Sequence, residues 1–76
     1  MDAIRLQRID AAQNMRRFYR LDVARDLFGR WCLVQEWGRI GGAGRLRLAA
    51  YESAAQAQDA LARKRRAKER RGYVAL

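Results

Sequence analysis

Histidine and proline are absent from this 76-residue chain, and cysteine occurs only once, as Cys32. A single cysteine cannot form an internal disulfide. Without histidine and with one thiol, the chain has no cysteine–histidine cluster of the kind that holds a structural zinc ion. The sequence therefore predicts no disulfide, no metal site and no cofactor.

Residue patterns that support catalysis are equally scarce. Cys32 falls inside a predicted strand, Ser53 is placed to cap a helix, and the eight acidic residues are scattered among arginines that would keep them ionised. A free-standing hydrolase or transferase needs a positioned nucleophile and base, a carboxylate pair in a cleft, or a metal ion. We therefore expect a non-catalytic protein, with no catalytic residue and no small-molecule substrate.

Long apolar runs are also missing. None approaches the roughly 20 residues that cross a bilayer, and the basic helix described below lacks the bulky apolar face of an interfacial helix. The N-terminus carries Asp2 and alternating polarity, so it resembles neither a secretory signal nor an organelle-targeting helix. These features predict a soluble cytoplasmic protein without a membrane partner, and association with the nucleoid is a further expectation.

Acidic residues are outnumbered by basic ones. The chain has 17 lysines and arginines against eight acids, a formal net charge of +9. On so small a body this excess creates a strongly positive field, which favours nucleic acid, an anionic membrane or an acidic protein as partner. An arginine-rich composition can also reflect a GC-rich genome and a solvated surface. Charge alone therefore leaves the partner open.

Half of the residues are apolar, which suits a globular core, although many of them are alanine. A chain this short buries only about 60% of the surface that its unfolded form exposes. The larger side chains predicted to form the core are Ile4, Leu6, Ile9, Tyr19, Leu21, Val23, Leu27, Trp31, Leu33, Leu48, Leu61, Tyr73 and Val74. This thin core could gain burial from an oligomer or a bound partner.

Alternation of apolar and polar side chains predicts four strands, at residues 3–9, 15–25, 31–37 and 45–51. A polar break is expected at 10–14, a turn at 26–30 and a glycine-rich turn at 38–44. The glycines of the last turn indicate positive φ angles or close approach of another backbone. Consecutive strands joined by such short turns predict an antiparallel meander.

One helix is predicted from 54 to 71. Ser53 is a favourable N-cap with Gln56 at capping-box spacing, and Gly72 is placed to end the helix. Residues 73–76 could return as a short edge strand. We therefore predict a single α+β domain over residues 1–76, a small antiparallel β-sheet of four to five strands with one helix from the C-terminal half packed across it.

The glycine-rich turn carries the most specific candidate site. It leads into a strand rather than a helix, so it does not fit a nucleotide-binding phosphate loop. Trp37 ends its predicted strand beside Gly38, where its indole could stack on a base or sugar for about 1–3 kcal/mol per base. Arg39 would lie on the same side and could hold a phosphate. The alternative is that Trp37 completes the core and Arg39 pairs with Glu36.

A second candidate lies in residues 63–71, where seven of nine residues are basic. Lys64 and Lys68 share a helix face with Ala57 and Leu61. Either the helix extends beyond the sheet, or the lysine stems lie across it with their ammonium groups at the rim. A solvated helix end whose cations complement the helix dipole is the alternative to a binding role.

These features together resemble the WGR domain, over residues from about 4 to 73. The matching residues are Phe18 and Tyr19, Trp37-Gly38-Arg39-Ile40-Gly41 with Gly44, Ala57 and Leu61, and Lys68 with Tyr73. The family occurs in poly(ADP-ribose) polymerases and in bacterial proteins, and the resemblance implies an antiparallel sheet crossed by one helix that recognises DNA breaks. It also implies that Trp37 packs on the sugar at a 5′ end, that Arg39 bridges DNA and neighbouring domains, and that Arg17 lies near the DNA backbone.

We therefore predict sequence-independent binding of nucleic acid, DNA in preference to RNA, at ends or nicks. The predicted contact residues are Trp37 for stacking and Arg17, Arg39, Arg45, Lys64 and Lys68 for phosphates. The alternative is a protein-interaction module whose Trp37 and Arg39 surface docks an acidic partner or a second copy of the chain.

Overall fold

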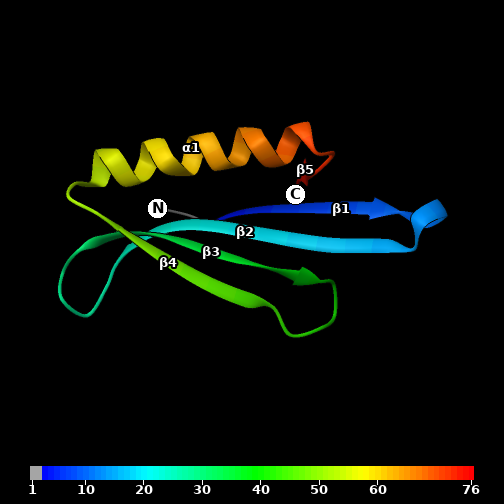
Figure 1. Ribbon diagram of the computed structural model, residues 1–76, viewed down its shortest axis with the longest axis horizontal. Coiled ribbons are helices and arrows are strands. Elements are labelled where there is room, and N and C mark those ends of the chain that lie inside the picture. The colour runs from blue at the N-terminus through cyan, green and yellow to red at the C-terminus, as the bar shows by residue number, and fades with distance from the viewer. Residues whose placement is uncertain (1–2) are drawn as a thin grey trace.

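A five-stranded antiparallel sheet and one α-helix form two layers (Figure 1). The computed structural model describes residues 3–76. The strands, β1 (Ile4–Asp10), β2 (Met15–Arg25), β3 (Trp31–Arg39), β4 (Arg45–Tyr51) and β5 (Val74–Ala75), pair in the order β4-β3-β2-β1-β5. Helix α1 (Ala54–Arg70) crosses one face of the sheet. The predicted α+β fold class is therefore confirmed, and residues 74–75 do return as a short edge strand.

The ends of α1 are set by the local signals in the sequence. The Ser53 hydroxyl accepts a hydrogen bond from the Gln56 backbone N–H at 3.1 Å. At the other end Gly72 has a φ of +94°, and the N–H groups of Gly72 and Tyr73 donate to the carbonyls of Glu69 and Lys68 at 3.0 and 3.1 Å. This pair of bonds is the Schellman motif, which reverses the chain. The reversal returns Tyr73 to the sheet beside β1.

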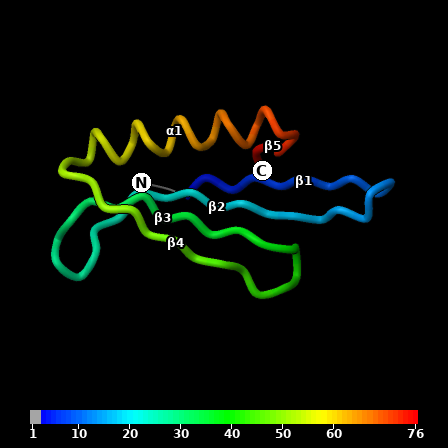
Figure 2. The backbone as a smooth tube through the Cα atoms, viewed as in Figure 1, coloured from blue at the N-terminus to red at the C-terminus, as the bar shows by residue number. Residues whose placement is uncertain are grey.

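The core lies between α1 and the sheet face that it covers. It is built from five sheet residues and three helix residues, namely Leu6, Tyr19, Leu21, Val23, Leu33, Ala57, Ala60 and Leu61. The alanines have short side chains, so the helix can approach the sheet closely. Figure 2 shows that the turn between β1 and β2 extends past the C-terminal end of α1, so the helix leaves that end of the sheet uncovered.

Four residues predicted to lie in the core are more than half exposed: Ile9, Leu27, Leu48 and Val74. Ile9 and Leu48 are on the face that has no helix, because they alternate with residues of the covered face. Leu27 lies in the turn between β2 and β3, and Val74 lies in the two-residue edge strand. The alternation was recognised correctly, but the prediction did not distinguish the covered face from the open one.

The predicted end of the third strand at Trp37 is wrong, because β3 continues to Arg39. Gly38 pairs with Phe18 of β2 within the sheet. A Cβ atom on Gly38 would lie 3.0 Å from the Gly44 Cα, and one on Gly44 would lie 2.9 Å from the Phe18 Cζ. These two glycines therefore permit a close packing of the following loop against Phe18, and Trp37 lies inside a strand rather than at its end.

The predicted polar break at 10–14 contains a short 3-10 helix, η1 (Ala11–Gln13). The Asp10 carboxylate accepts the N–H of Ala12 at 3.1 Å and begins it, and Asn14, at a φ of 50°, ends it. Asparagine is one of the few residues that tolerates this left-handed conformation. The connection from β1 to β2 is therefore a defined turn.

Candidate nucleic-acid interface

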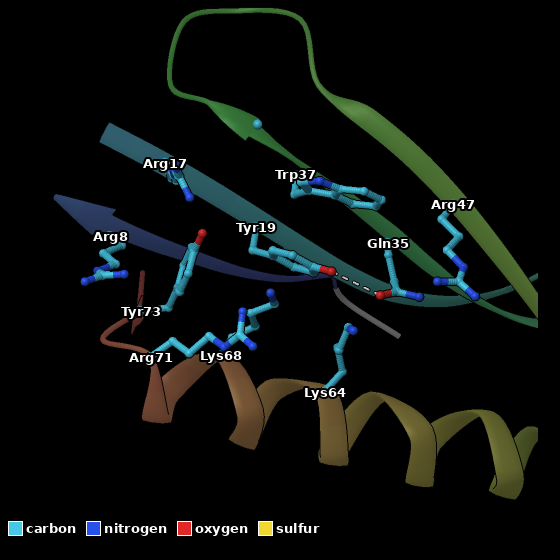
Figure 3. A pocket seen from close by; sticks show the side chains of 11 residues that line it. Arg8, Arg17, Tyr19, Gln35, Trp37, Arg47, Lys64, Lys68, Arg71 and Tyr73 are labelled. Carbon is cyan, nitrogen blue, oxygen red and sulfur yellow. Dashed lines mark hydrogen bonds between the residues drawn. The ribbon is translucent and has the colours of Figure 1, made fainter. Parts of the chain in front are cut away.

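A groove of about 530 Å³ opens between the C-terminal half of α1 and the sheet (Figure 3). We call it the cationic groove. Its basic side chains are Arg8, Arg17, Arg47, Lys64, Lys68 and Arg71, and the remaining lining residues are Tyr19, Gln35, Trp37, Gly38 and Tyr73. None of these lining residues is acidic. Basic side chains from three strands and the helix thus converge on one aromatic surface.

The aromatic surface follows from strand register. Tyr19 and Trp37 are directly opposite on β2 and β3, and their rings stack with centroids 5.7 Å apart and planes 12° apart. Such cross-strand aromatic pairs stabilise a sheet. Tyr73 meets Tyr19 edge to face at 6.0 Å. Tyr19 is buried and covers one face of the indole, whereas Trp37 is only half-buried and borders the groove.

The Tyr19 hydroxyl completes the base of the groove by donating a hydrogen bond to the Gln35 Oε1 at 3.1 Å (Figure 3). Both side chains are buried, so the pair satisfies polar atoms that would otherwise lose contact with water. Burial, assisted by the neighbouring Tyr73, raises the pKa of Tyr19 above its ordinary value. The Tyr19 phenol is therefore a fixed neutral donor at physiological pH.

Lys68 joins the helix to this aromatic surface. Its Nζ lies 4.5 Å from the centroid of the Tyr19 ring and 5.8 Å from that of Tyr73, within the range of cation–π attraction. Burial, followed by the charges of Lys64 and Arg71, lowers the pKa of Lys68. Of the two arrangements left open by the sequence, the second is therefore correct for Lys68, since its stem lies across the sheet.

The six predicted contact residues occupy two different places. Arg17, Trp37, Lys64 and Lys68 line the cationic groove together. Arg39 and Arg45 do not line it: both are exposed, and Arg45 lies opposite Trp37 on β4. The Arg39 Nη1 donates to the Asn14 carbonyl at 3.4 Å.

The suggested pairing of Arg39 with Glu36 is wrong. The Glu36 carboxylate bonds instead to the Arg20 Nε at 3.1 Å. Side chains two residues apart on a strand share a face, whereas residues three apart do not. Arg39 therefore lies on the same side as Trp37, and Glu36 lies on the other side.

Three basic groove residues were missed from the sequence: Arg8, Arg47 and Arg71. Arg8 is opposite Arg17 and Arg47 is opposite Gln35, so both belong to the covered face. Arg8 lies two residues after Leu6, and Arg47 lies two residues after Arg45. Strand alternation could therefore have predicted that each shares a face with that neighbour. Their position near α1, however, depends on register and on where the helix ends, which alternation does not specify.

The groove cations have no acidic partners within residues 3–76. Ion pairs in that part of the chain involve other bases, Arg20, Arg30, Arg63 and Arg65. Six basic side chains without a carboxylate partner leave a concentrated positive field in a concave site, where field lines are focused. Such a site favours a ligand that carries several negative charges.

The family model of the WGR domain matches residues 2–76. The chain belongs to the WGR domain family. It is also 34% identical over 68 residues to a protein of Sinorhizobium fredii (strain NBRC 101917 / NGR234) described as uncharacterized protein y4dW. That match covers 90% of this chain but 33% of the relative, so the chain spans about a third of the relative's length. No solved structure matches the chain.

The WGR domain is a binding module associated with nucleic-acid binding in proteins related to poly(ADP-ribose) polymerases, and the match indicates no catalytic family. Among the residues described for this WGR domain, no helix combines the length and hydrophobicity needed to cross a membrane.

Proposed function

We propose that this WGR domain is a non-catalytic module that binds nucleic acid without sequence specificity, with one strand's phosphates in the cationic groove. The observation that carries the proposal is the convergence of six basic side chains, without acidic partners in residues 3–76, on the surface formed by Tyr19, Trp37 and Tyr73. Phosphate contacts supply most of the affinity in such binding and carry no sequence information.

The roles follow from position. Arg17, Arg47, Lys64 and Lys68 border the groove from β2, β4 and α1 and would contact successive phosphates. Arg39 and Arg45, which lie outside the groove, would contact phosphates that flank it. The WGR family association favours DNA over RNA as the ligand.

Trp37 gives the reason to propose ends and nicks. Tyr19 covers one face of its indole, so only the remaining surface at the groove can accept a ligand group. Within an intact duplex the bases are stacked and the backbone alone reaches such a surface. At a break the terminal sugar and base become accessible to the indole, and stacking adds about 1–3 kcal/mol per base.

The test is a salt-titrated binding series on nicked, blunt-ended, single-stranded and closed circular DNA. We expect the nicked and blunt DNA to bind tightest, and the logarithm of affinity to fall with the logarithm of salt by about 0.9 per phosphate contacted on duplex DNA. Trp37→Ala should remove the preference for breaks and leave affinity for closed DNA nearly unchanged. Affinity that ignores salt, or equal binding of nicked and closed circles, contradicts the proposal.

The competing function is docking of an acidic protein, or of a second copy, on the Trp37 and Arg39 surface. Partners captured from lysate that persist after nuclease digestion would support it over the nucleic-acid proposal. We further propose a cytoplasmic location at the nucleoid, where a fluorescent fusion should coincide with stained DNA. A diffuse signal unaffected by Trp37→Ala would contradict that placement.

A further inference from the structure

Strand β4 forms a long open edge of the sheet. It pairs with β3 on one side, and within residues 3–76 no strand pairs with its other side. β4 has seven residues, whereas the opposite edge strand, β5, has two. An edge of this length presents a row of backbone N–H and C=O groups that an extended chain can use.

The side of this edge that faces the helix is cationic. A groove of about 340 Å³ lies between β4 and α1, and we call it the edge groove. Its basic side chains are Arg47, Arg63 and Lys64, and the small side chains of Ala49, Ala60 and Ala67 leave space between them. The lining also includes Leu33, Gln35 and Tyr51, and none of these residues is acidic.

The other side of the same edge carries large exposed apolar side chains. Leu46 and Leu48 point away from the helix and are 62% and 55% exposed. Leu48 borders a hollow of about 430 Å³ together with Leu27 and Phe28 of the turn between β2 and β3, and the charged residues Arg25, Asp26 and Arg30 complete its lining. Leu27 is fully exposed and Phe28 is 83% exposed. Leu27, Phe28 and Leu48 therefore meet beside the open edge, and Leu46 lies two residues before Leu48 on β4.

The exposed turn is held in place rather than left loose. The Asp26 Oδ1 accepts the backbone N–H groups of Phe28 and Arg30, each at 2.9 Å. The Asp26 Oδ2 lies 2.7 Å from the Arg30 Nε. The fixed backbone of this turn has little conformational entropy to lose on binding, which favours association.

We propose that the β4 edge binds an extended segment of a partner protein in which acidic and apolar residues alternate. Side chains of an added strand point alternately to its two faces. Acidic side chains would therefore meet Arg47 and Lys64 in the edge groove, together with Arg63, where they would compete with its exposed ion pair to Asp59. Apolar side chains would meet Leu46, Leu48 and Phe28. Backbone hydrogen bonds to β4 would provide affinity, and the alternation would provide specificity.

A second copy of this chain fits this edge less well. Pairing two β4 strands would bring another Arg45 and Arg47 close to a groove that is already cationic. Like charges on neighbouring strands are destabilising. The same charges that oppose self-association therefore favour an acidic strand.

This binding site overlaps in part with the proposed nucleic-acid site. Arg63, Leu48 and Phe28 do not line the cationic groove, whereas Arg47 and Lys64 line both grooves. An acidic strand and a nucleic acid should therefore compete for these two residues. The two activities can be tested independently. Arg63→Gln and Leu48→Ser test strand binding, whereas Arg17→Gln and Trp37→Ala test nucleic-acid binding.

The first experiment measures fluorescence anisotropy of a labelled peptide of alternating glutamate and valine, as long as β4. We expect it to bind about tenfold tighter than a peptide of the same composition with all glutamates in one half. Arg63→Gln and Leu48→Ser should each weaken binding several-fold. Arg66→Gln, an exposed change on α1 that touches neither groove, should leave it unchanged, and Leu48→Ser should keep the wild-type affinity for DNA.

The second experiment tests strand addition directly. Amides of an added strand alternate between facing β4 and facing solvent. We therefore compare two peptides, one N-methylated at the odd-numbered residues and the other at the even-numbered residues. The peptide whose β4-facing amides are methylated should not bind, and the other should bind normally. Equal binding of the two methylated peptides would overturn the proposal. Equal binding of the alternating and the segregated peptide would do so too, as would equal losses from Arg63→Gln and Arg66→Gln.

Discussion

The ammonium group of Lys68 lies 4.5 Å from the centroid of the Tyr19 ring, and this ring in turn stacks on Trp37. A continuous contact therefore runs from the helix through the buried tyrosine to the indole. Lys68 both packs the end of α1 against the sheet and carries a charge into the cationic groove. The shape of the groove and the position of the helix end are therefore coupled.

The ionisation of Lys68 should be visible in the pH dependence of stability. Burial, then the charges of Lys64 and Arg71, lowers its pKa in the folded state below the ordinary 10.5. Between these two values the unfolded state binds more protons, so stability contributed by this group rises with pH. The melting temperature of the wild type should therefore rise relative to that of Lys68→Met as the pH rises through the alkaline range toward 10.5. A constant or falling difference would contradict this assignment.

The buried hydrogen bond between Tyr19 and Gln35 should contribute to the stability of the fold. Tyr19→Phe removes the hydroxyl that donates to the Gln35 Oε1 and leaves that buried oxygen without its donor. We expect a loss of about 1–3 kcal/mol in the free energy of unfolding. The double variant with Gln35→Leu should recover part of the loss, because no buried acceptor is then unpaired. A denaturant series checks this, and equal stability of Tyr19→Phe and wild type would contradict it.

Close packing in the glycine-rich loop should make an alanine substitution costly at Gly44 but not at Gly42. A Cβ atom on Gly44 would lie 2.9 Å from the Phe18 Cζ and 3.0 Å from the Trp37 carbonyl oxygen. Gly44→Ala should therefore cost about 1–3 kcal/mol. That cost corresponds to about 4–8 °C in melting temperature per kcal/mol.

Gly42→Ala is the matched control, since the nearest atom to its added Cβ is the Arg39 carbonyl oxygen at 3.5 Å, an ordinary contact. We expect it to change stability by less than about 1 kcal/mol. Equal effects of the two substitutions would show that the loss of stability comes from reduced flexibility of the loop and not from packing against Phe18.

Much of this fold could be predicted from local patterns. Alternation located the four long strands, and Ser53 and Gly72 marked the ends of α1, because caps and period-two burial depend on neighbouring residues alone. The extension of β3 to Arg39 could not be predicted in the same way. Gly38 is compatible with a turn, and only its pairing with Phe18 shows that it belongs to the strand.

The candidate site was only partly predictable for a similar reason. Lys64 and Lys68 were located by helical periodicity, and Trp37 by its sequence context. Arg8 and Arg47 join them only through the register of β1 with β2 and of β4 with β3. Register depends on contacts between distant segments, which a single sequence does not report.

The turn between β2 and β3 should be sensitive to acid. The Arg30 N–H, followed by the Arg30 side chain and the Phe28 N–H, holds the pKa of Asp26 below its ordinary 3.8, against the opposing effect of burial. A carboxylate with a lowered pKa stabilises the fold above the unfolded value, and this stabilisation is lost as pH falls through the folded one.

Asp26→Asn should therefore lower the melting temperature near pH 5 and lose this difference as the pH falls well below 3.8. Asp59→Asn removes only an exposed ion pair with Arg63 and should change stability by about 0.5 kcal/mol or less. A difference for Asp26→Asn that stays constant from pH 5 downward would contradict the role of its charge.

Two adjacent arginines separate local binding from the effect of net charge. Arg17 lines the cationic groove, whereas Arg16 is exposed on the opposite face, because successive residues of β2 point to opposite sides. Arg17→Gln and Arg16→Gln lower the net charge equally. If the groove holds the phosphates, Arg17→Gln should weaken binding of all DNA forms about tenfold and lower the salt slope by about 0.9. Arg16→Gln should change affinity by less than about twofold, since a distant exposed charge is screened by salt. Equal losses in the two variants would show that binding follows the overall charge and that the groove is not the site.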